Sequence, residues 1–529
     1  MTGQQVAAPG QDEILARYLL LCALVIHCIL TLPFILSFPP IDYAADESWM
    51  LNISRSIAST GRPLAPMHAG TPLAAEPQMI TLWLYNGILA GVVKLFGESL
   101  LCARLLSWLS GCGALCFTYL LARRMAGRLA GAAATLLLAA NIAFSLQSRM
   151  VRPETMLLCI TLAAVYCYYR ALTEPDNRLL LFLSALLATL SVEVHPNGAI
   201  IAATLLLAFP FLHGRRIWSR SFAWFTSGLA LGTMIWVCAN LLPLSKSSFG
   251  TVHGKYLPPL LNAGISNALS TAFHKLIIIM TPSSWNRVLD FYLSSLHSWM
   301  LYTFILLPAL IGLFFPATRR NIALLAGLVL TAQFIAFLII GEWGKGHPVI
   351  FAPFAAIAVA VTLQNIADSG KPWQTVTYLA ALAIIATPFI IDTASRNWRY
   401  TAFNLAPIQK KLAEVIPENT PYLGSGIHYF LRGKGSGNYL SPLILEGNCA
   451  DFTSIVDYLG TEYVIIDSAL IDLSNTWCGE SYRQSIASFA DRNETIFSSA
   501  VDYPTYYGGN LDFLQVIKVK PPFSRQRNE

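Results

Sequence analysis

The sequence predicts a polytopic α-helical membrane protein with a soluble α/β domain at its C-terminal end. Hydrophobic residues make up 55% of the 529 residues and charged residues only 12%, whereas charged residues are about a quarter of a typical soluble domain. The mean hydropathy is +0.54, and stretches of the ~20 apolar residues that a membrane helix needs recur along the chain. Hydropathy falls from about Ser395 onward. We therefore expect a transmembrane module at residues 1–394 and a soluble domain at residues 395–529.

About eleven spans are expected from these apolar stretches. Their predicted bounds are Ile14–Leu36, Leu100–Ala122, Leu129–Leu146, Pro153–Arg170, Leu179–Val192, Gly198–Leu212, Phe222–Leu242, Trp299–Phe315, Ile322–Ile340, Pro348–Ile366 and Thr375–Ile391. The first span is expected to stay in the protein rather than be cleaved as a signal peptide, because no small-residue cleavage site follows it.

Two segments decide how the spans alternate across the membrane. Met79–Phe96 is apolar enough to span the membrane, but counting it as a span would move every later loop to the opposite side of the membrane. We expect it to lie in the outer interface as a juxtamembrane helix. Leu179–Leu212 has basic residues on both flanks. It is expected to enter and return as two short helices joined at His195–Gly198, with a tip buried in protein or facing a wet cavity.

The basic residues predict the orientation. The basic residues of alternate loops between the spans fall on one face of the predicted bundle, which the positive-inside rule makes cytoplasmic. They are Arg123, Arg124, Arg128, Arg170, Arg178, Arg215, Arg216, Arg220, Arg319, Arg320 and Lys371. The N-terminus is then cytoplasmic, and the C-terminal domain lies outside the inner (plasma) membrane. Because these loops carry much of the net charge of +6, the charge indicates topology and not binding to nucleic acid.

The C-terminal domain is expected to be a small α/β layer with its own core. Helices are predicted at 406–415, 452–459 and 482–490, and strands at 422–426, 463–467 and 513–519. Cys449 and Cys478 are the only cysteines of this domain. They are expected to form a disulfide, because the domain is placed in an oxidising compartment.

An acidic pair, Asp46–Glu47, follows the first predicted span at the start of a short helix that ends at Gly61. Acids are favoured at a helix N-terminus, and one of them could be a simple N-cap. A cap does not explain two acids beside a membrane exit. We therefore take the pair as candidate catalytic residues, with Asp46 as the general base.

Further candidates lie near the outer ends of other spans. Glu154 is a third candidate catalytic acid, although an acid after Pro153 at a helix start has a structural explanation too. Cationic candidates for binding a phosphate are Arg149, Arg152, Lys345 and His347. The two arginines could instead reach lipid headgroups, and Lys345 and His347 could belong to a plain turn.

A divalent metal is a candidate cofactor with weak support. Glu76 and His253, together with His68, could ligate one, but their spacing carries no metal-binding pattern. No Cys/His motif of a metal site is present in the sequence, so no metal ligand is assigned.

The order of these features resembles the GT-C glycosyltransferases, in the branch of the protein O-mannosyltransferases and lipid A aminoarabinose transferases. The matching features are the outer acidic pair Asp46–Glu47, the interfacial helix Glu76–Tyr85, the Arg-rich end of the second span at Tyr119–Arg128, and Arg149 followed five residues later by Glu154. The resemblance covers residues 14–220 well and the remaining spans loosely. No single one of these motifs is specific, but the four of them in this order are.

The resemblance implies a glycosyltransferase that moves a single sugar from a polyprenyl-phosphate donor to an acceptor hydroxyl at the outer membrane face, with inversion. The acceptor would be a glycan, glycolipid or protein of the cell envelope. An attacking hydroxyl needs a base within hydrogen-bond reach, and the departing lipid phosphate needs cations.

Two other functions remain open from the sequence. A transporter or flippase could use charged residues near helix ends to line a path, although the halves of the chain show no internal repeat of the kind that transporters carry. A non-catalytic assembly protein that acts through its outer domain is the third reading.

Overall fold

The computed structural model describes most of the helical part and much of the C-terminal domain. In the helical part the described residues are 11–36, 46–68, 82–174, 177–213, 220–241, 311, 313–314, 319–329, 331, 348–367 and 372–401. In the C-terminal part they are 406–417, 420–425, 428, 438–439, 451–468, 470–471, 479–504 and 510–520.

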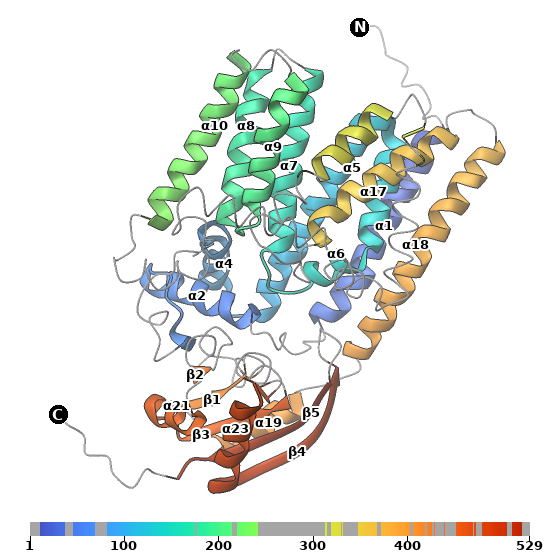
Figure 1. The fold of residues 1–529 in the computed structure, drawn as a ribbon. Coiled ribbons are helices and arrows are strands. Elements are labelled where there is room, and N and C mark those ends of the chain that lie inside the picture. The colour runs from blue at the N-terminus through green and yellow to red at the C-terminus, as the bar shows by residue number, and fades with distance from the viewer. Residues whose placement is uncertain are drawn as a thin grey trace.

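Helices form a bundle at one end of the molecule, and a sheet with its own helices lies at the other (Figure 1). The described elements of the bundle are α1 (Gln11–Leu36), α2 (Asp46–Thr60), η1 (Pro66–His68), α4 (Trp83–Phe96), α5 (Leu100–Ala140), α6 (Ile142–Ser148), α7 (Glu154–Thr173), α8 (Arg178–Leu190), η2 (Ser191–Glu193), α9 (Gly198–His213), α10 (Arg220–Trp236), η4 (Val237–Leu241), α17 (Pro348–Ala367) and α18 (Pro372–Thr401).

Five of the described helices are long and apolar enough to cross a membrane. They are Asp12–Leu36, Leu100–Ala140, Glu154–Thr173, Arg220–Asn240 and Trp373–Ser395. Large apolar side chains on these helices, such as Leu21, Trp224 and Ile391, are exposed, as expected of surfaces that face lipid. The protein is thus a polytopic helical membrane protein. The expected span Trp299–Phe315 lies largely outside the described residues, and so does about half of the expected span Ile322–Ile340.

Helix α5 contains two of the expected spans. Ala126 and Gly127 have non-helical dihedral angles inside it, and Gly127 has φ of +93°, so the chain bends at the Arg-rich stretch. The second of these spans was expected to run to Leu146, but α5 ends at Ala140. The reason is local: the Asn141 side chain accepts the backbone N–H of Phe144 at 3.1 Å, and this N-cap starts the separate helix α6.

The expected helical hairpin is present as α8 and α9, with η2 and a turn between them. Gly198 begins α9 against the backbone of Ser191, where a Cβ atom would collide. The tip therefore requires glycine at this position. The tip lies at the end of the bundle that faces the C-terminal sheet (Figure 1).

Helices α2 and α4 lie between the bundle and the C-terminal sheet (Figure 1). Each is too short to span, with 15 and 14 residues, and they contact each other. Inside the segment expected as a juxtamembrane helix from Met79, the described helix begins at Trp83, after Leu82 with φ of +51°. Residues 79–81 lie outside the described residues.

The C-terminal domain contains a five-stranded mixed sheet in the order β2-β1-β3-β5-β4. Its described elements are α19 (Ala406–Val415), β1 (Tyr422–Gly424), β2 (Asn438–Tyr439), α21 (Phe452–Leu459), β3 (Tyr463–Asp467), α23 (Glu480–Arg492), β4 (Glu494–Pro504) and β5 (Asn510–Lys518). Strands β2, β1 and β3 are parallel, whereas β5 is antiparallel to both β3 and β4. The expected boundary at residue 395 lies inside α18, which continues to Thr401.

Two strands, β2 and β4, were not expected from the sequence. They are the edges of the sheet, and β4 is mostly half-exposed or exposed with two irregularities in its pairing to β5. Edge strands of this kind lack the apolar alternation that marks a strand in sequence. Cys449 and Cys478 lie outside the described residues, so their disulfide stays a prediction.

Candidate active site

A buried ion pair fixes the start of α2. The Glu47 carboxylate binds Arg104 of α5 through both oxygens, from Nε to Oε1 at 3.0 Å and from Nη2 to Oε2 at 2.9 Å. Both side chains have no exposed surface. Glu47 Oε1 also accepts the backbone N–H of Val151 at 2.8 Å. A buried carboxylate needs such a set of donors, and this set joins α2 to the segment between α6 and α7.

That segment carries the two predicted arginines. Arg149 is fully buried, with its guanidinium 4.0 Å from the ring centroid of Phe34 in α1. The guanidinium of Arg104 lies 5.1 Å from the same ring. Cations over an aromatic face are attracted by its quadrupole. Phe34 therefore contacts two buried positive charges at this end of the bundle.

Arg152 and Glu154 form a second ion pair at the start of α7. Arg152 donates from Nε and Nη2 to Glu154 Oε1 at 3.0 and 2.7 Å. Glu154 is 4% exposed, and its Oε2 is buried with no hydrogen-bond partner among the described residues. The Ser107 hydroxyl lies 3.4 Å from both the N–H and the carbonyl oxygen of Arg152, which fixes the backbone before α7.

The predicted site residues that are described therefore lie together at one end of the bundle. Glu47 contacts the segment that contains Arg149 and Arg152, and Glu154 follows directly. Asp46 begins α2, so its backbone lies one residue from the Glu47 anchor; its side chain lies outside the described part. Their roles as catalytic or phosphate-binding groups stay predictions.

Lys345, His347, Glu76 and His253 lie outside the described residues. His68 ends η1, and its side chain is likewise not described. Among the described residues, no group of three or more His, Cys, Asp or Glu side chains could hold a metal ion. The candidate divalent metal thus stays a prediction.

Arg104 was missed by the sequence reasoning. It lies only four residues into α5, within an expected span that is otherwise apolar. An ionisable residue inside a span is by itself a functional hypothesis, so a lone arginine in this span was the available signal. Its partner, 57 positions away along the chain, could not be named without the fold.

Residues 82–238 match the family model of the dolichyl-phosphate-mannose-protein mannosyltransferases. This stretch covers less than half of the chain, and contains Arg104, Arg149, Arg152 and Glu154. No curated protein sequence matches the chain.

Solved structures with the same fold were found. ArnT from Cupriavidus metallidurans bound to undecaprenyl phosphate has a TM-score of 0.58 at 12% identity, over 96% of this chain and 99% of that chain. The oligosaccharyltransferase of Archaeoglobus fulgidus in complex with Zn and sulfate has a TM-score of 0.58 at 14% identity, over 93% of this chain and 73% of that chain. The resemblance expected from the sequence is therefore confirmed, and the chain has the fold of the GT-C glycosyltransferases.

Proposed function

We propose that the protein is an inverting glycosyltransferase that moves one sugar from a polyprenyl-phosphate donor to an acceptor hydroxyl at the outer membrane face. The observation that carries the proposal is the anchoring of Glu47 by Arg104 and Val151. This contact brings the side chain of Glu47, the neighbour of Asp46 in sequence, to the backbone N–H of Val151, one residue before Arg152. Two acids and their cations thereby meet at one end of a membrane bundle.

The burial of Glu47 indicates which residue of the acidic pair acts as the base. Glu47 is held by an arginine fork and a backbone N–H, so a proton taken up there would break a buried ion pair. Asp46 is then the carboxylate that can accept the proton of an attacking hydroxyl. A direct attack with one base leads to inversion, because the sugar never becomes bound to the protein.

The leaving group is a lipid phosphate, which cations must stabilise as it departs. Arg149 and Arg152 are the described candidates, joined by Lys345 and His347 from the sequence. Two N–H groups of Arg152 already bind Glu154, and Arg149 is covered by Phe34. Phosphate binding by either arginine therefore requires that the donor approach beside these contacts. The complex of ArnT with undecaprenyl phosphate supports a donor of this class.

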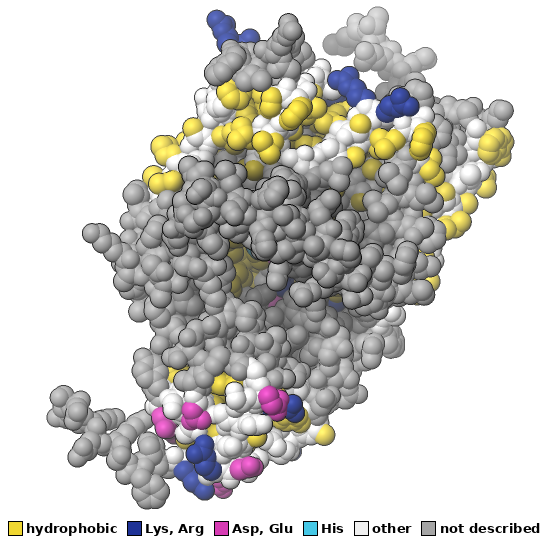
Figure 2. Space-filling view, in the orientation of Figure 1, with side chains coloured by type: hydrophobic (Ala, Val, Ile, Leu, Met, Phe, Trp, Pro, Cys, Tyr) yellow, Lys and Arg dark blue, Asp and Glu magenta, His cyan; other side chains and the backbone are white. Residues whose placement is uncertain are grey.

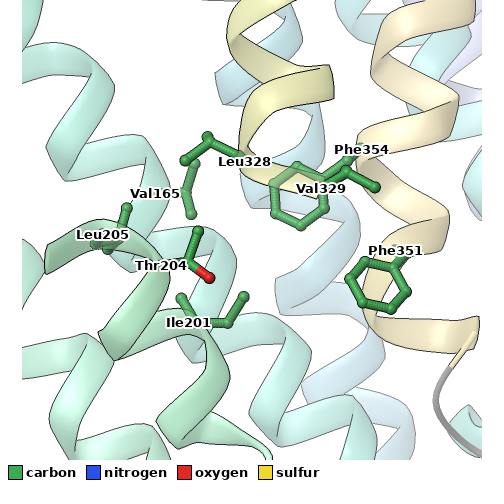
Figure 3. A pocket seen from close by; sticks show the side chains of 8 residues that line it. All are labelled: Val165, Ile201, Thr204, Leu205, Leu328, Val329, Phe351 and Phe354. Carbon is green, nitrogen blue, oxygen red and sulfur yellow. The ribbon is translucent and has the colours of Figure 1, made fainter. Parts of the chain in front are cut away.

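A small apolar pocket lies inside the bundle, and we propose that the lipid chain packs near its lining (Figure 3). The pocket lies between α7, α9, α17 and the helical segment that contains Leu328. Seven of its eight lining residues are apolar; the lining is Val165, Ile201, Thr204, Leu205, Leu328, Val329, Phe351 and Phe354. An isoprenoid chain needs such a surface and makes no hydrogen bonds there.

The acceptor and the cellular setting are part of the proposal. A glycan, glycolipid or protein of the cell envelope would meet the site from the side of the C-terminal domain. We place the protein in the inner (plasma) membrane with a cytoplasmic N-terminus and an extracytoplasmic C-terminal domain.

Turnover of a labelled donor tests the function. Purified protein in lipid nanodiscs would be incubated with radiolabelled polyprenyl-phosphate sugars and a cell-envelope extract, and the label would be followed into products by mass spectrometry. Transfer with inverted anomeric configuration is expected. The same donors in sealed vesicles report movement across the membrane. Movement without transfer would favour the transporter or flippase, and neither transfer nor movement would favour a non-catalytic role.

A further inference from the structure

Asn321 joins the helical segment 319–329 to two other helices at the end of the bundle farthest from the C-terminal sheet (Figure 1). Its Nδ2 donates to the carbonyl oxygen of Met125 in α5 at 3.0 Å, and its Oδ1 accepts the hydroxyl group of Tyr169 in α7 at 3.2 Å. Met125 directly precedes the bend of α5, where helical hydrogen bonds are interrupted and carbonyl oxygens need other donors. The first turn of the segment is therefore fixed against both α5 and α7.

This contact holds two arginines at the ends of α5 and α7. Arg319 and Arg320 directly precede Asn321, and both are exposed. Arg319 donates from Nε to the carbonyl oxygen of Leu313 at 2.9 Å. Within the described part of the chain, neither guanidinium pairs with an acid. Both arginines can therefore meet an anion from outside the protein.

The ionised groups next to them on α5 and α7 add to the positive charge. Glu174 accepts Arg124 at 2.6 Å and Arg170 at 2.7 Å, so one carboxylate faces two guanidinium groups. With Arg319 and Arg320, the cluster holds four arginines and one glutamate, a net charge of +3. The positive-inside rule explains why basic residues lie at this end. It does not require that two of them be fixed together without acidic partners.

An apolar surface lies beside the two arginines. Phe314 is 79% exposed and Ile311 is 43% exposed, and the bond from Arg319 to Leu313 ties the turn that contains Phe314 to the start of the segment. Figure 2 shows hydrophobic side chains next to Lys and Arg side chains at this end of the molecule. A ligand that suits both surfaces has an anionic head and an apolar tail.

We propose that Arg319 and Arg320, beside the Arg124–Glu174–Arg170 cluster, bind the anionic headgroup of a bilayer phospholipid whose acyl chains pack on Phe314. Guanidinium groups match the oxygens of a phosphate, and basic clusters at the ends of membrane helices attract anionic lipids. A dissolved phosphate ester would use the arginines but would leave Phe314 uncovered. The site lies at the opposite end of the bundle from the candidate active site, so it is separate from donor binding.

The test removes the two charges and keeps the size and polarity of the side chains. The full-length double variant Arg319→Gln with Arg320→Gln would be compared with wild type and with Arg220→Gln. Arg220 is an exposed arginine that begins α10, on another side of the bundle (Figure 1). Native mass spectrometry of the protein in neutral detergent would give the Kd of phosphatidylglycerol, of zwitterionic phosphatidylcholine, and of glycerol 3-phosphate, which has no acyl chains.

Wild type should bind phosphatidylglycerol more tightly than either of the other two ligands. The double variant should bind phosphatidylglycerol about 30-fold more weakly, because each arginine near a membrane surface contributes about fivefold in affinity for anionic lipid. Arg220→Gln should bind it as wild type does. Thermal unfolding in lipid-free detergent should be the same for all three proteins, because the substituted side chains are exposed.

Unchanged phosphatidylglycerol binding in the double variant would overturn the inference. Equal losses in the double variant and in Arg220→Gln would do so too, because they would report the overall charge of this end and not a site. If glycerol 3-phosphate bound as tightly as phosphatidylglycerol, the ligand would be a dissolved phosphate ester and the assignment to a lipid would be wrong.

Discussion

At the scale of single residues, the two neighbouring acids at the start of α2 have different proposed roles. Glu47 is enclosed by Arg104 and the Val151 N–H, and its removal would leave a buried arginine without its ionic partner. Asp46 begins the helix and is the proposed base. The difference leads to opposite expectations for the two residues: one substitution should affect activity, and the other should affect folding.

Asp46→Asn tests the base. Asn is similar in size and is an equally good N-cap, but it cannot take a proton. Turnover should fall about 10²-fold or more, while expression, thermal unfolding and donor binding stay as in wild type. The measurement is the initial rate of sugar transfer at saturating donor. A rate close to wild type would show that Asp46 is only a helix cap.

Glu47→Ala tests whether the buried ion pair between Glu47 and Arg104 stabilises the fold. The loss of a buried partner from Arg104 should cost about 3–5 kcal/mol of stability, measured as a lower unfolding temperature in detergent. Removing Arg104 as well should recover part of that loss, because no uncompensated charge then stays buried. The matched control is Glu13→Ala, which removes a partly exposed acid that pairs with Arg17 at 2.9 Å and with Arg128 at the surface. This control should melt close to wild type; equal melting of Glu47→Ala and Glu13→Ala would contradict the anchor.

The sequence allowed part of this site to be predicted. Charge is rare in the chain, so Asp46, Glu47, Arg149, Arg152 and Glu154 stood out against apolar spans. Their pairing was not predictable. Arg152 pairs with the acid two residues away, whereas Glu47 pairs with an arginine in another helix. Which residues pair depends on how the helices pack, and the periodicity of the sequence does not indicate that.

At the scale of elements, close helix packing depends on small residues. In α10, a Cβ atom at Gly228 would collide with the backbone carbonyl of Phe182 in α8. A backbone atom cannot rotate away, so α8 and α10 would have to separate. Small residues serve this purpose generally in membrane helices. In α4, by contrast, Gly91 has open space where its Cβ would lie.

Gly228→Ala should therefore destabilise the protein by about 1–3 kcal/mol. Gly91→Ala is its control, because the same change in an uncrowded helix should stabilise by about 0.5–1 kcal/mol through backbone entropy. Thermal unfolding of both variants in the same detergent makes the comparison. Equal shifts of the two melting temperatures would show that α8 and α10 do not need this close approach.

Element prediction succeeded where a local signal was strong. The helix at 452–459 and the strand at 463–467 have the expected bounds, because Asp451 caps the helix through the Ser454 N–H and β3 is buried at every position. It failed at the edge strands β2 and β4, whose pairing is decided by the rest of the sheet.

At the scale of the whole molecule, charge is distributed unevenly along the long axis. Figure 2 shows Lys and Arg side chains at the end farthest from the C-terminal domain, with hydrophobic side chains on the helices next to them. Most acidic side chains visible in this view lie on the C-terminal domain, where Lys and Arg side chains are visible too. The basic end includes exposed Arg123, Arg124 and Arg128. Near it, Glu174 binds Arg170 and Arg124, and the hydrogen bond from Arg170 holds the pKa of Glu174 below its usual value.

This distribution predicts the orientation in the membrane. Basic loops stay in the cytoplasm, so fluorescent-protein fusions after Glu174 should be bright and alkaline-phosphatase fusions there inactive. Fusions after Thr60, which ends α2, and after Glu529 should give the reverse, because α2 and the C-terminal sheet lie beyond the opposite end of the bundle (Figure 1). The fusion after Glu174 thus serves as the internal control for the other two. If all three positions gave the opposite fluorescence and phosphatase results, the proposed base Asp46 would face the cytoplasm, and the donor would have to be used on that side of the membrane.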